Sequence, residues 1–262
     1  MVTVVRYELD GQVAIITLDR PERLNAFNAQ MHADLDTAIR RFRADDGARA
    51  AVVTAAGDRA FSAGQDIHEL ADLDAFLEKV PGFWEAVYTD RFDREMEQHK
   101  PMVAAVNGHC VGEGLCLAMA CDLRVCSDDA SFLMPEVALG IPVVVGAAQS
   151  TRLMGLGQAL ELLLLGEARD AEWALRAGLV NKVVPKAEVF DAALAWARRL
   201  AAVGPLAVRA TREIARRSLE TDFSTAIRMG EAMRRVATGL SGDLREGLTA
   251  AAQGRTPDFP GR

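Results

Sequence analysis

The pattern of apolar and polar positions predicts short strands and helices in turn over roughly the first 150 residues. Apolar positions within 4–9 and 12–18 flank Asp10-Gly11, a dipeptide typical of a two-residue hairpin turn, and so predict two paired strands. A helix over 29–43 is predicted by apolar residues that recur at helical spacing, namely Met31, Leu35, Ile39 and Phe42.

The rest of the chain continues this pattern and then becomes helical. Short apolar segments predict strands at 50–54, 102–106, 122–126 and 131–134, and small residues predict a helix over 114–120. The stretch 70–98 is charged and predicted to be mostly helical, with a break at Pro81-Gly82. After Thr151 the pattern is helical throughout, with segments at 173–177, 188–202, 205–219, 223–238 and 243–253. We therefore expect an α/β core followed by a helical C-terminal part.

Composition narrows the class of protein. The 262 residues are 50% apolar and 26% charged, which is typical of a globular protein and excludes disorder as the main state. The net charge of −7 argues against nucleic acid as a partner, because phosphate binding needs clustered cations. The longest uncharged run, 137–151, is interrupted and too short to span a membrane, and residues 1–10 do not resemble a signal peptide. We expect a soluble, cytoplasmic protein that binds neither membrane nor nucleic acid.

Several common catalytic signatures are missing from the sequence. The glycine spacings of dinucleotide and P-loop sites are absent, and the four histidines lack metal-ligand spacing. The four cysteines contain no C-x-x-C pair and are expected to be small buried thiols: Cys110, Cys116, Cys121 and Cys126. Residues 108–112 fit G-x-C-x-G, a thiol form of the nucleophile elbow, but no histidine follows position 109 to serve as its base. We therefore expect no metal site and no nucleophile elbow.

Two glycine-rich stretches remain, at 61–66 and 107–114, and each follows a predicted strand. Glycine lets the backbone turn sharply or come close to a ligand. If a helix starts after such a loop, its first N–H groups point outward and can bind a negative oxygen. From composition alone, an oxyanion hole and a pair of tight turns remain equally open.

The residues of these stretches, with several other blocks, resemble the crotonase superfamily, also called the enoyl-CoA hydratase/isomerase family. The resemblance covers about 13–259, and its blocks lie at 20–27, 61–67, 100–108, 117–122, 130–136, 177–185 and 243–259. The blocks occur in the family's order, which is specific for the family but not for one reaction.

The resemblance implies a fold and a ligand class. The expected fold is α/β, a crotonase-like (ClpP/crotonase) spiral of ββα units over 1–200, with a C-terminal helical trimerisation region over 201–262. Members of the family bind acyl-CoA thioesters, need no metal or redox cofactor, and assemble as homotrimers or dimers of trimers. By resemblance, the N–H groups of Gln65 and Glu113 would hold the thioester oxygen as it becomes an enolate.

The resemblance also implies the residues that contact coenzyme A and the acyl group. The expected set is Arg23, Leu24, Ala26, Ala63, Asp66, Ile67, Gly112, Cys116, Val143 and Val144. Arg209 or Arg212 is a further candidate for a phosphate contact.

The chain departs from the family pattern at one catalytic position. Family hydratases use two glutamates; Glu136 matches the second, whereas Cys116 stands where the first is expected. A single carboxylate suits an isomerase, in which one base moves a proton from C2 to C4 of a 3-enoyl-CoA. We expect Glu136 to be that base, in an apolar setting that raises its pKa. Two alternatives remain: a hydratase or lyase in which Glu113 replaces the missing glutamate, and a non-catalytic acyl-CoA binder.

Overall fold

The computed structural model describes residues 3–67, 100–239 and 241–261, and its strands form two sheets. The larger sheet has six strands in the order β1 (Val5–Asp10), β2 (Val13–Leu18), β3 (Ala50–Ala55), β5 (Met102–Val106), β7 (Leu123–Ser127) and β10 (Lys182–Val184). β1 and β2 form the predicted antiparallel hairpin, and every other pairing in this sheet is parallel. The charged stretch 70–98 lies outside the described residues.

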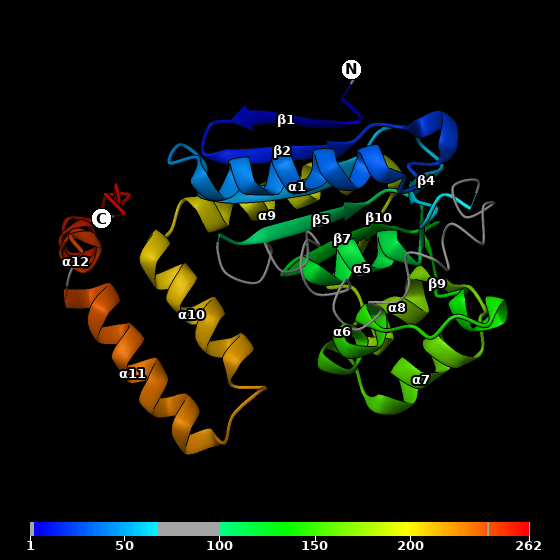
Figure 1. The fold of residues 1–262 in the computed structure, drawn as a ribbon. Helices are drawn as coiled ribbons and strands as arrows, with labels where there is room; N and C mark the ends of the chain where they lie inside the picture. Colours follow the sequence, from blue (N-terminus) through cyan, green and yellow to red (C-terminus); the bar gives the residue numbers. More distant parts are fainter. Residues whose placement is uncertain (1–2, 68–99, 240, 262) are drawn as a thin grey trace.

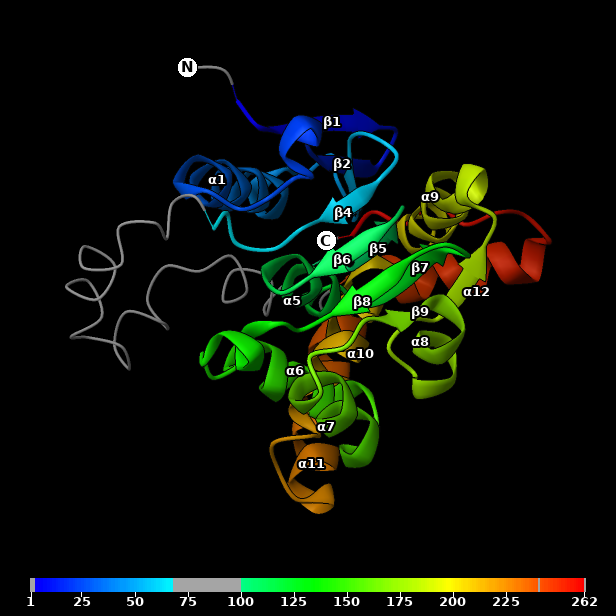
Figure 2. The same ribbon diagram turned by 90° about the vertical axis from the view of Figure 1, so that its right-hand side faces the viewer.

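The smaller sheet provides the edge at which the candidate site lies. Its order is β4 (Ala60–Ser62), β6 (His109–Val111), β8 (Ser131–Leu133) and β9 (Arg169–Asp170), as Figure 2 shows. The first three strands are parallel, so their carboxyl ends meet at one edge.

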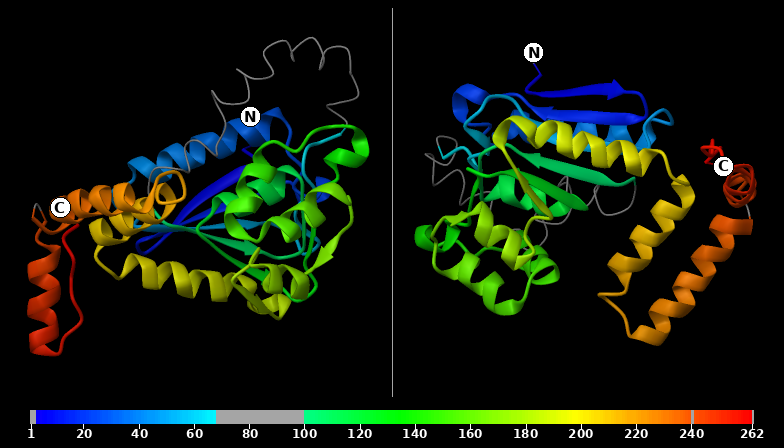
Figure 3. Two further views of the ribbon diagram at one scale, coloured as in Figure 1. Left: turned by 90° about the horizontal axis from the view of Figure 1, so that it is seen from below. Right: turned by 180° about the vertical axis from the view of Figure 1, so that it is seen from behind.

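Helices cover both faces of the larger sheet and extend beyond it (Figures 1 and 3). They are α1 (Ala29–Ala44), α5 (Glu113–Ala120), α6 (Val145–Leu153), α7 (Leu156–Leu164), α8 (Ala171–Ala177), α9 (Val189–Ala201), α10 (Pro205–Arg217), α11 (Phe223–Gly239) and α12 (Asp243–Gln253). Three short 3₁₀ turns are η1 (Pro21–Arg23), η2 (Glu136–Leu139) and η3 (Lys186–Glu188). No helix of the described ranges has both the length and the apolar character that a membrane span requires.

The central strands bury both of their faces, which explains why they read as continuous apolar segments. Along β3, Ala51 and Val53 belong to the core under α1 and α5, whereas Ala50 and Val52 belong to the core under α9. Side chains alternate between the faces of a strand, so one strand supplies both cores.

Helix α1 is held at both ends. The Asn28 side chain caps its start by accepting the Met31 N–H at 2.9 Å. At the other end, Lys100 Nζ donates to the carbonyls of Phe42 at 3.0 Å and Asp45 at 2.6 Å. The buried Lys100 ammonium therefore satisfies carbonyls that have no partner inside the helix.

The helices α10–α12 extend away from the sheets (Figure 3). Specific polar contacts connect them to the core. Asp122 accepts Arg212 Nε at 2.6 Å and Arg216 at 3.0 Å, and its other oxygen accepts the Met102 N–H. At the end of the chain, Arg49 donates to the Phe259 carbonyl at 2.6 Å. The C-terminal region is thus connected to the sheet at two separate points.

The α/β core and the helical C-terminal part are as predicted, but several local assignments are wrong. β4 overlaps and β6 lies within the glycine-rich stretches 61–66 and 107–114, for which the sequence predicted no strand. β9 and β10 interrupt a region expected to be entirely helical. Helices α6 and α7 were not among the predicted segments. These strands have two or three residues each, which is too short for an alternation of apolar and polar residues to be recognised in the sequence.

Asp122→Ala should lower the free energy of unfolding by about 3 kcal/mol, because it removes the carboxylate from a mostly buried Arg212. Chemical denaturation measures this loss, and limited proteolysis should show earlier cleavage within 205–253. Asp10→Ala is the matched control; it removes an exposed ion pair with Arg198 and should change stability by less than about 1 kcal/mol. Equal effects of the two substitutions would contradict the role given to Asp122.

Candidate active site

The candidate residues lie at one edge of the smaller sheet, because each of them follows the end of one of its three parallel strands. β4 ends at Ser62 before Gly64-Gln65, β6 ends at Val111 before Gly112, and β8 ends at Leu133 shortly before Glu136. Sequence-distant segments therefore meet at the carboxyl ends of neighbouring strands.

Gly64 and Gly112 bring two backbone segments into contact. Both adopt the left-handed region, with φ of +85° and +49°. A Cβ on Gly64 would lie 3.0 Å from the Val111 carbonyl oxygen and 3.6 Å from the Glu113 nitrogen. A Cβ on Gly112 would lie 3.0 Å from Glu136 Oε1 and 3.8 Å from the Gly64 Cα. Only glycine allows this approach, which places Gly64, the Glu113 amide and the Glu136 carboxyl around one point.

The peptide of Gln65 is oriented by a bridge to Phe27. Phe27 N–H donates to the Gly64 carbonyl at 2.8 Å, and Asp66 N–H donates to the Phe27 carbonyl at 2.9 Å. Because backbone groups alternate sides along an extended chain, the N–H of Gln65 points away from Phe27. No hydrogen bond within the described parts of the chain uses that N–H.

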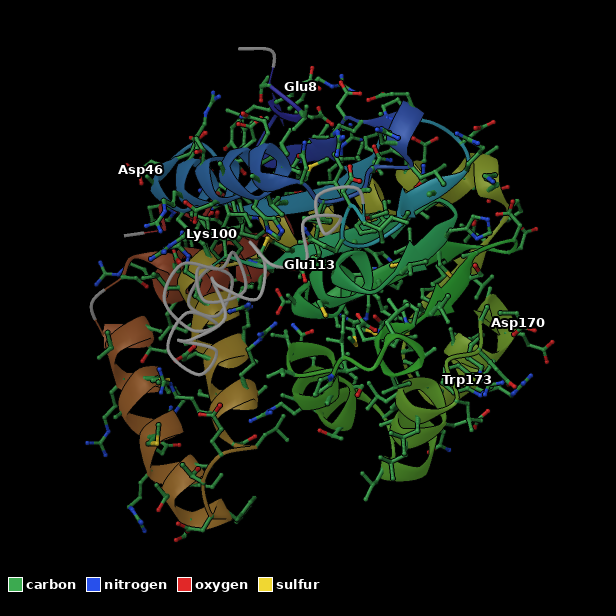
Figure 4. The ribbon with its side chains drawn as sticks, turned by 45° about the vertical axis from the view of Figure 1, so that its right-hand side comes forward. Glu8, Asp46, Lys100, Glu113, Asp170 and Trp173 are labelled. Atoms are coloured by element: carbon green, nitrogen blue, oxygen red, sulfur yellow. The ribbon has the colours of Figure 1, made fainter. Side chains whose placement is uncertain are left out.

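Glu113 is the first residue of α5, and Figure 4 shows it at the amino-terminal end of that helix. N–H groups in the first turn of a helix have no partner inside it, and they carry the positive end of the helix dipole. The residues of α5 beyond Glu113 are all buried, which holds this amide rigidly. The amides of Gln65 and Glu113 flank the Gly64–Gly112 contact, an arrangement able to stabilise a negative oxygen.

Glu136 presents a carboxyl group suited to proton transfer. Its Oε2 is buried and has no hydrogen-bond partner among the described residues. Burial raises the pKa of Glu136, the negative charge of Glu113 raises it further, and a backbone hydrogen bond opposes these effects. A carboxyl with a raised pKa is suited to accept and return a proton near neutrality.

Glu113 and Cys116 lie one turn apart on α5, near this carboxyl. Glu113 directly follows Gly112, whose backbone approaches Glu136 Oε1, and its negative charge contributes to the raised pKa of Glu136. Cys116 is buried, and its N–H donates to the Gly112 carbonyl at 3.0 Å. Residues three apart on a helix share a face, so the acid and the thiol stand side by side.

The residues predicted to contact coenzyme A are distributed around this edge. Arg23 and Ile67 are exposed, Ala63 is half-buried, and Ala26 is buried. Leu24 and Asn25 adopt positive φ values of 52° and 54°, and the Leu24 carbonyl accepts the Ala63 N–H at 2.9 Å. The two loops expected to hold the ligand therefore lie against each other.

Some candidate residues serve the scaffold. Asp66 is buried and accepts both terminal nitrogens of Arg20, at 3.3 and 3.2 Å, which ties the 63–67 loop to the 20–26 loop. Val143 packs on the core, and Val144 is half-buried at the start of α6. The guanidinium of Arg212 is mostly buried against Asp122, which disfavours the suggested phosphate contact.

Two structural residues of the site were missed from the sequence. Asn25 donates to the carbonyls of Ala56 and Ala60, both at 3.0 Å, and its own oxygen accepts the Arg20 N–H. Asn25 and Arg20 both lie within the 20–27 block, which was the available signal, but their partners are visible only in the fold.

Within residues 3–67, 100–239 and 241–261, no three His, Cys, Asp or Glu side chains are placed to hold a metal ion.

Comparison with known proteins gives one consistent family. A family model described as "Enoyl-CoA hydratase/isomerase" matches residues 8–262. The chain is 38% identical over 261 residues to a "Probable enoyl-CoA hydratase" of Rhizobium meliloti, covering 97% of each chain. It is 37% identical to a "Carnitinyl-CoA dehydratase" of Salmonella arizonae, covering 98% of each. A crystal structure of an enoyl-CoA hydratase subunit from Geobacillus kaustophilus superposes with a TM-score of 0.89 at 34% identity, covering 99% of this chain and 98% of that one.

Glu136→Gln should be more stable than the wild type at neutral pH. The folded pKa of Glu136 lies above the ordinary 4.5, so the fold binds this proton more tightly than the unfolded chain does. The stability contributed by Glu136 therefore falls as pH rises through the raised pKa, and the advantage of Glu136→Gln vanishes below about pH 4. Thermal unfolding across pH measures this difference, and Glu220→Gln, at an exposed position, is the control. If Glu136→Gln is no more stable than the wild type at neutral pH, ionisation of Glu136 costs the folded protein no stability and the prediction is wrong.

Proposed function

The chain belongs to the enoyl-CoA hydratase/isomerase family, and from that premise we propose that it moves a proton on the acyl group of a CoA thioester. The expected crotonase-like α/β fold is confirmed by the match to solved members of the family. The reaction that the site supports best is isomerisation of a 3-enoyl-CoA to the conjugated 2-enoyl-CoA, with Glu136 as the single acid and base.

The proposed sequence of steps follows from where charge appears. Glu136 removes a proton from C2, and the electron pair moves to the thioester oxygen, which becomes an enolate. The N–H groups of Gln65 and Glu113 would stabilise that oxygen; losing one such donor typically costs about 10²–10³ in rate. Glu136 then returns the proton at C4, and the double bond becomes conjugated with the carbonyl. The coenzyme A moiety is part of the substrate, and the steps use no further cofactor.

The observation that carries this proposal is the buried Oε2 of Glu136 beside the Gly64–Gly112 contact, an oxygen with no hydrogen-bond partner among the described residues. A buried carboxyl oxygen without a hydrogen bond is unfavourable unless a function requires it. Cys116 supports the choice of isomerase, because a neutral thiol is a poor substitute for a second carboxylate.

Hydration of a 2-enoyl-CoA, or the reverse dehydration, is the second candidate. The position of Glu113 beside Gly112, whose backbone approaches Glu136, favours it, because two carboxyl groups can share the activation of water and the delivery of a proton. Relatives named "Short-chain-enoyl-CoA hydratase" and "Carnitinyl-CoA dehydratase" also support this second candidate.

We also propose that the C-terminal helices make the contacts of a homotrimer or a dimer of trimers. Large apolar side chains are exposed along α11 and α12 and the preceding turn: Leu219, Phe223, Ile227, Val236, Leu244 and Leu248. Phe223 is 83% exposed, an unfavourable state for an aromatic ring unless another surface covers it.

Glu136→Gln should lower the rate of 3-enoyl-CoA isomerisation by about 10³ or more, because the proton carrier is lost. The absorbance of the conjugated thioester measures the reaction: a rise with 3-enoyl-CoA reports isomerisation, and a fall with 2-enoyl-CoA reports hydration. Glu113→Gln is the matched control; it should leave isomerisation within about threefold, because the Glu113 amide remains. A wild type that binds the thioester but catalyses neither reaction would indicate a non-catalytic binder.

Cys116→Glu should add hydration of 2-enoyl-CoA, since it restores a carboxylate on the face of α5 shared with Glu113. Cys116→Gln, of similar size and without charge, should not. The same absorbance assay measures both variants, and thermal unfolding checks that each is folded. Efficient hydration by the wild type, abolished in Glu113→Gln, would replace the isomerase proposal with the second candidate.

A further inference from the structure

His32, on the first turns of α1, contacts the side chain of the residue whose amide is the proposed oxyanion donor. His32 Nε2 lies 3.3 Å from Gln65 Oε1. An amide oxygen only accepts, so this hydrogen bond requires a proton on His32 Nε2. The contact joins α1 to the 63–67 loop near the site.

The imidazole is itself held in place by Phe27. The two ring centroids are 5.1 Å apart at an interplanar angle of 53°, and Phe27 is fully buried. Phe27 is also the residue whose backbone bridges Gly64 and Asp66. His32, Phe27 and Gln65 therefore form a closed triangle, with a ring contact, a backbone bridge and a side-chain hydrogen bond as its sides.

The peptide of Gln65 needs such support. It lies beyond the end of β4, follows the left-handed Gly64, and pairs with Phe27 only through an isolated bridge. A donor acts on developing charge only if its direction is set before the reaction. Asp66 fixes the far side of this peptide through Arg20, and His32 contacts Gln65 itself.

We propose that His32 is a positioning residue: it holds Gln65 so that the Gln65 N–H is aimed at the thioester oxygen. This inference rests on the proposed function and adds to it a residue outside the family motifs. Because the enolate interacts with that N–H more strongly than the substrate does, loss of His32 should reduce kcat and leave KM unchanged.

The test measures exchange of the C2 protons of butyryl-CoA for deuterium in D₂O, which isolates the proton transfer at C2 that both candidate reactions require. His32→Ala should lower kcat about three- to tenfold, the value expected for one modest hydrogen bond, with KM unchanged. His32→Phe keeps an aromatic ring against Phe27 and removes the donor, so it should show the same loss. His32→Gln retains a donor and should recover most of the rate.

A double-mutant cycle separates this role from a general structural one. Gln65→Ala keeps the backbone N–H and should lose as much rate as His32→Ala, and the double variant should lose no more than either. Thermal unfolding should differ little among the variants, because the hydrogen bond is exposed.

The outcomes distinguish the two proposals. If the wild type exchanges protons and His32→Ala has the same kcat, or changes KM alone, the positioning role is wrong and the proposed function stands. Additive losses in the double variant would also overturn it. If the wild type exchanges no proton, the proposed function fails, and the role of His32 fails with it.

Discussion

The contact between Gly64 and Gly112 is the constraint on which the site depends. It brings the end of β4 against the end of β6, so that amides from two loops and a carboxyl from a third share one small volume. Any side chain at either position would occupy the space between the backbone segments or collide with Glu136 Oε1. The surrounding hydrogen bonds, from Arg20 to Asp66 and from Phe27 to its neighbours, keep the segments at this separation.

The family motifs predicted much of this arrangement, and physical reasons explain what they missed. Gln65, Glu113 and Glu136 lie at one edge of the smaller sheet, because each follows a strand whose neighbours are set by the fold; their roles stay a prediction. In the smaller sheet β8 was predicted from its apolar residues, whereas β4, β6 and β9 were missed, because two or three residues are too few to show a periodicity. His32 was not predicted as part of the site, because its contact with Gln65 joins residues 33 positions apart. Such a pairing is visible only once α1 has packed on the sheet.

Helix α5 links the chemistry of the site to the interior of the protein. Its first residue lies next to the Gly64–Gly112 contact, and the rest of the helix is buried on all sides. The helix cannot shift without disturbing the core, so its amide is already oriented before a ligand arrives. A substitution of a carboxylate for the thiol at position 116 of this helix would therefore change the available acid–base groups without changing the fold.

The hydrogen bond from Arg49 to the Phe259 carbonyl joins residues 210 positions apart. Arg49 immediately precedes β3, whereas Phe259 follows α12 in the C-terminal helical part. Contacts of such sequence separation form late, since a long loop must close first. The sheets can therefore assemble before the segment around Phe259 docks, and a partly folded chain lacks this contact. In such a chain α10 can already be held through Asp122, whose partners Arg212 and Arg216 are only 90 and 94 positions away. The segment after α12 is then still detached, and its docking completes the fold.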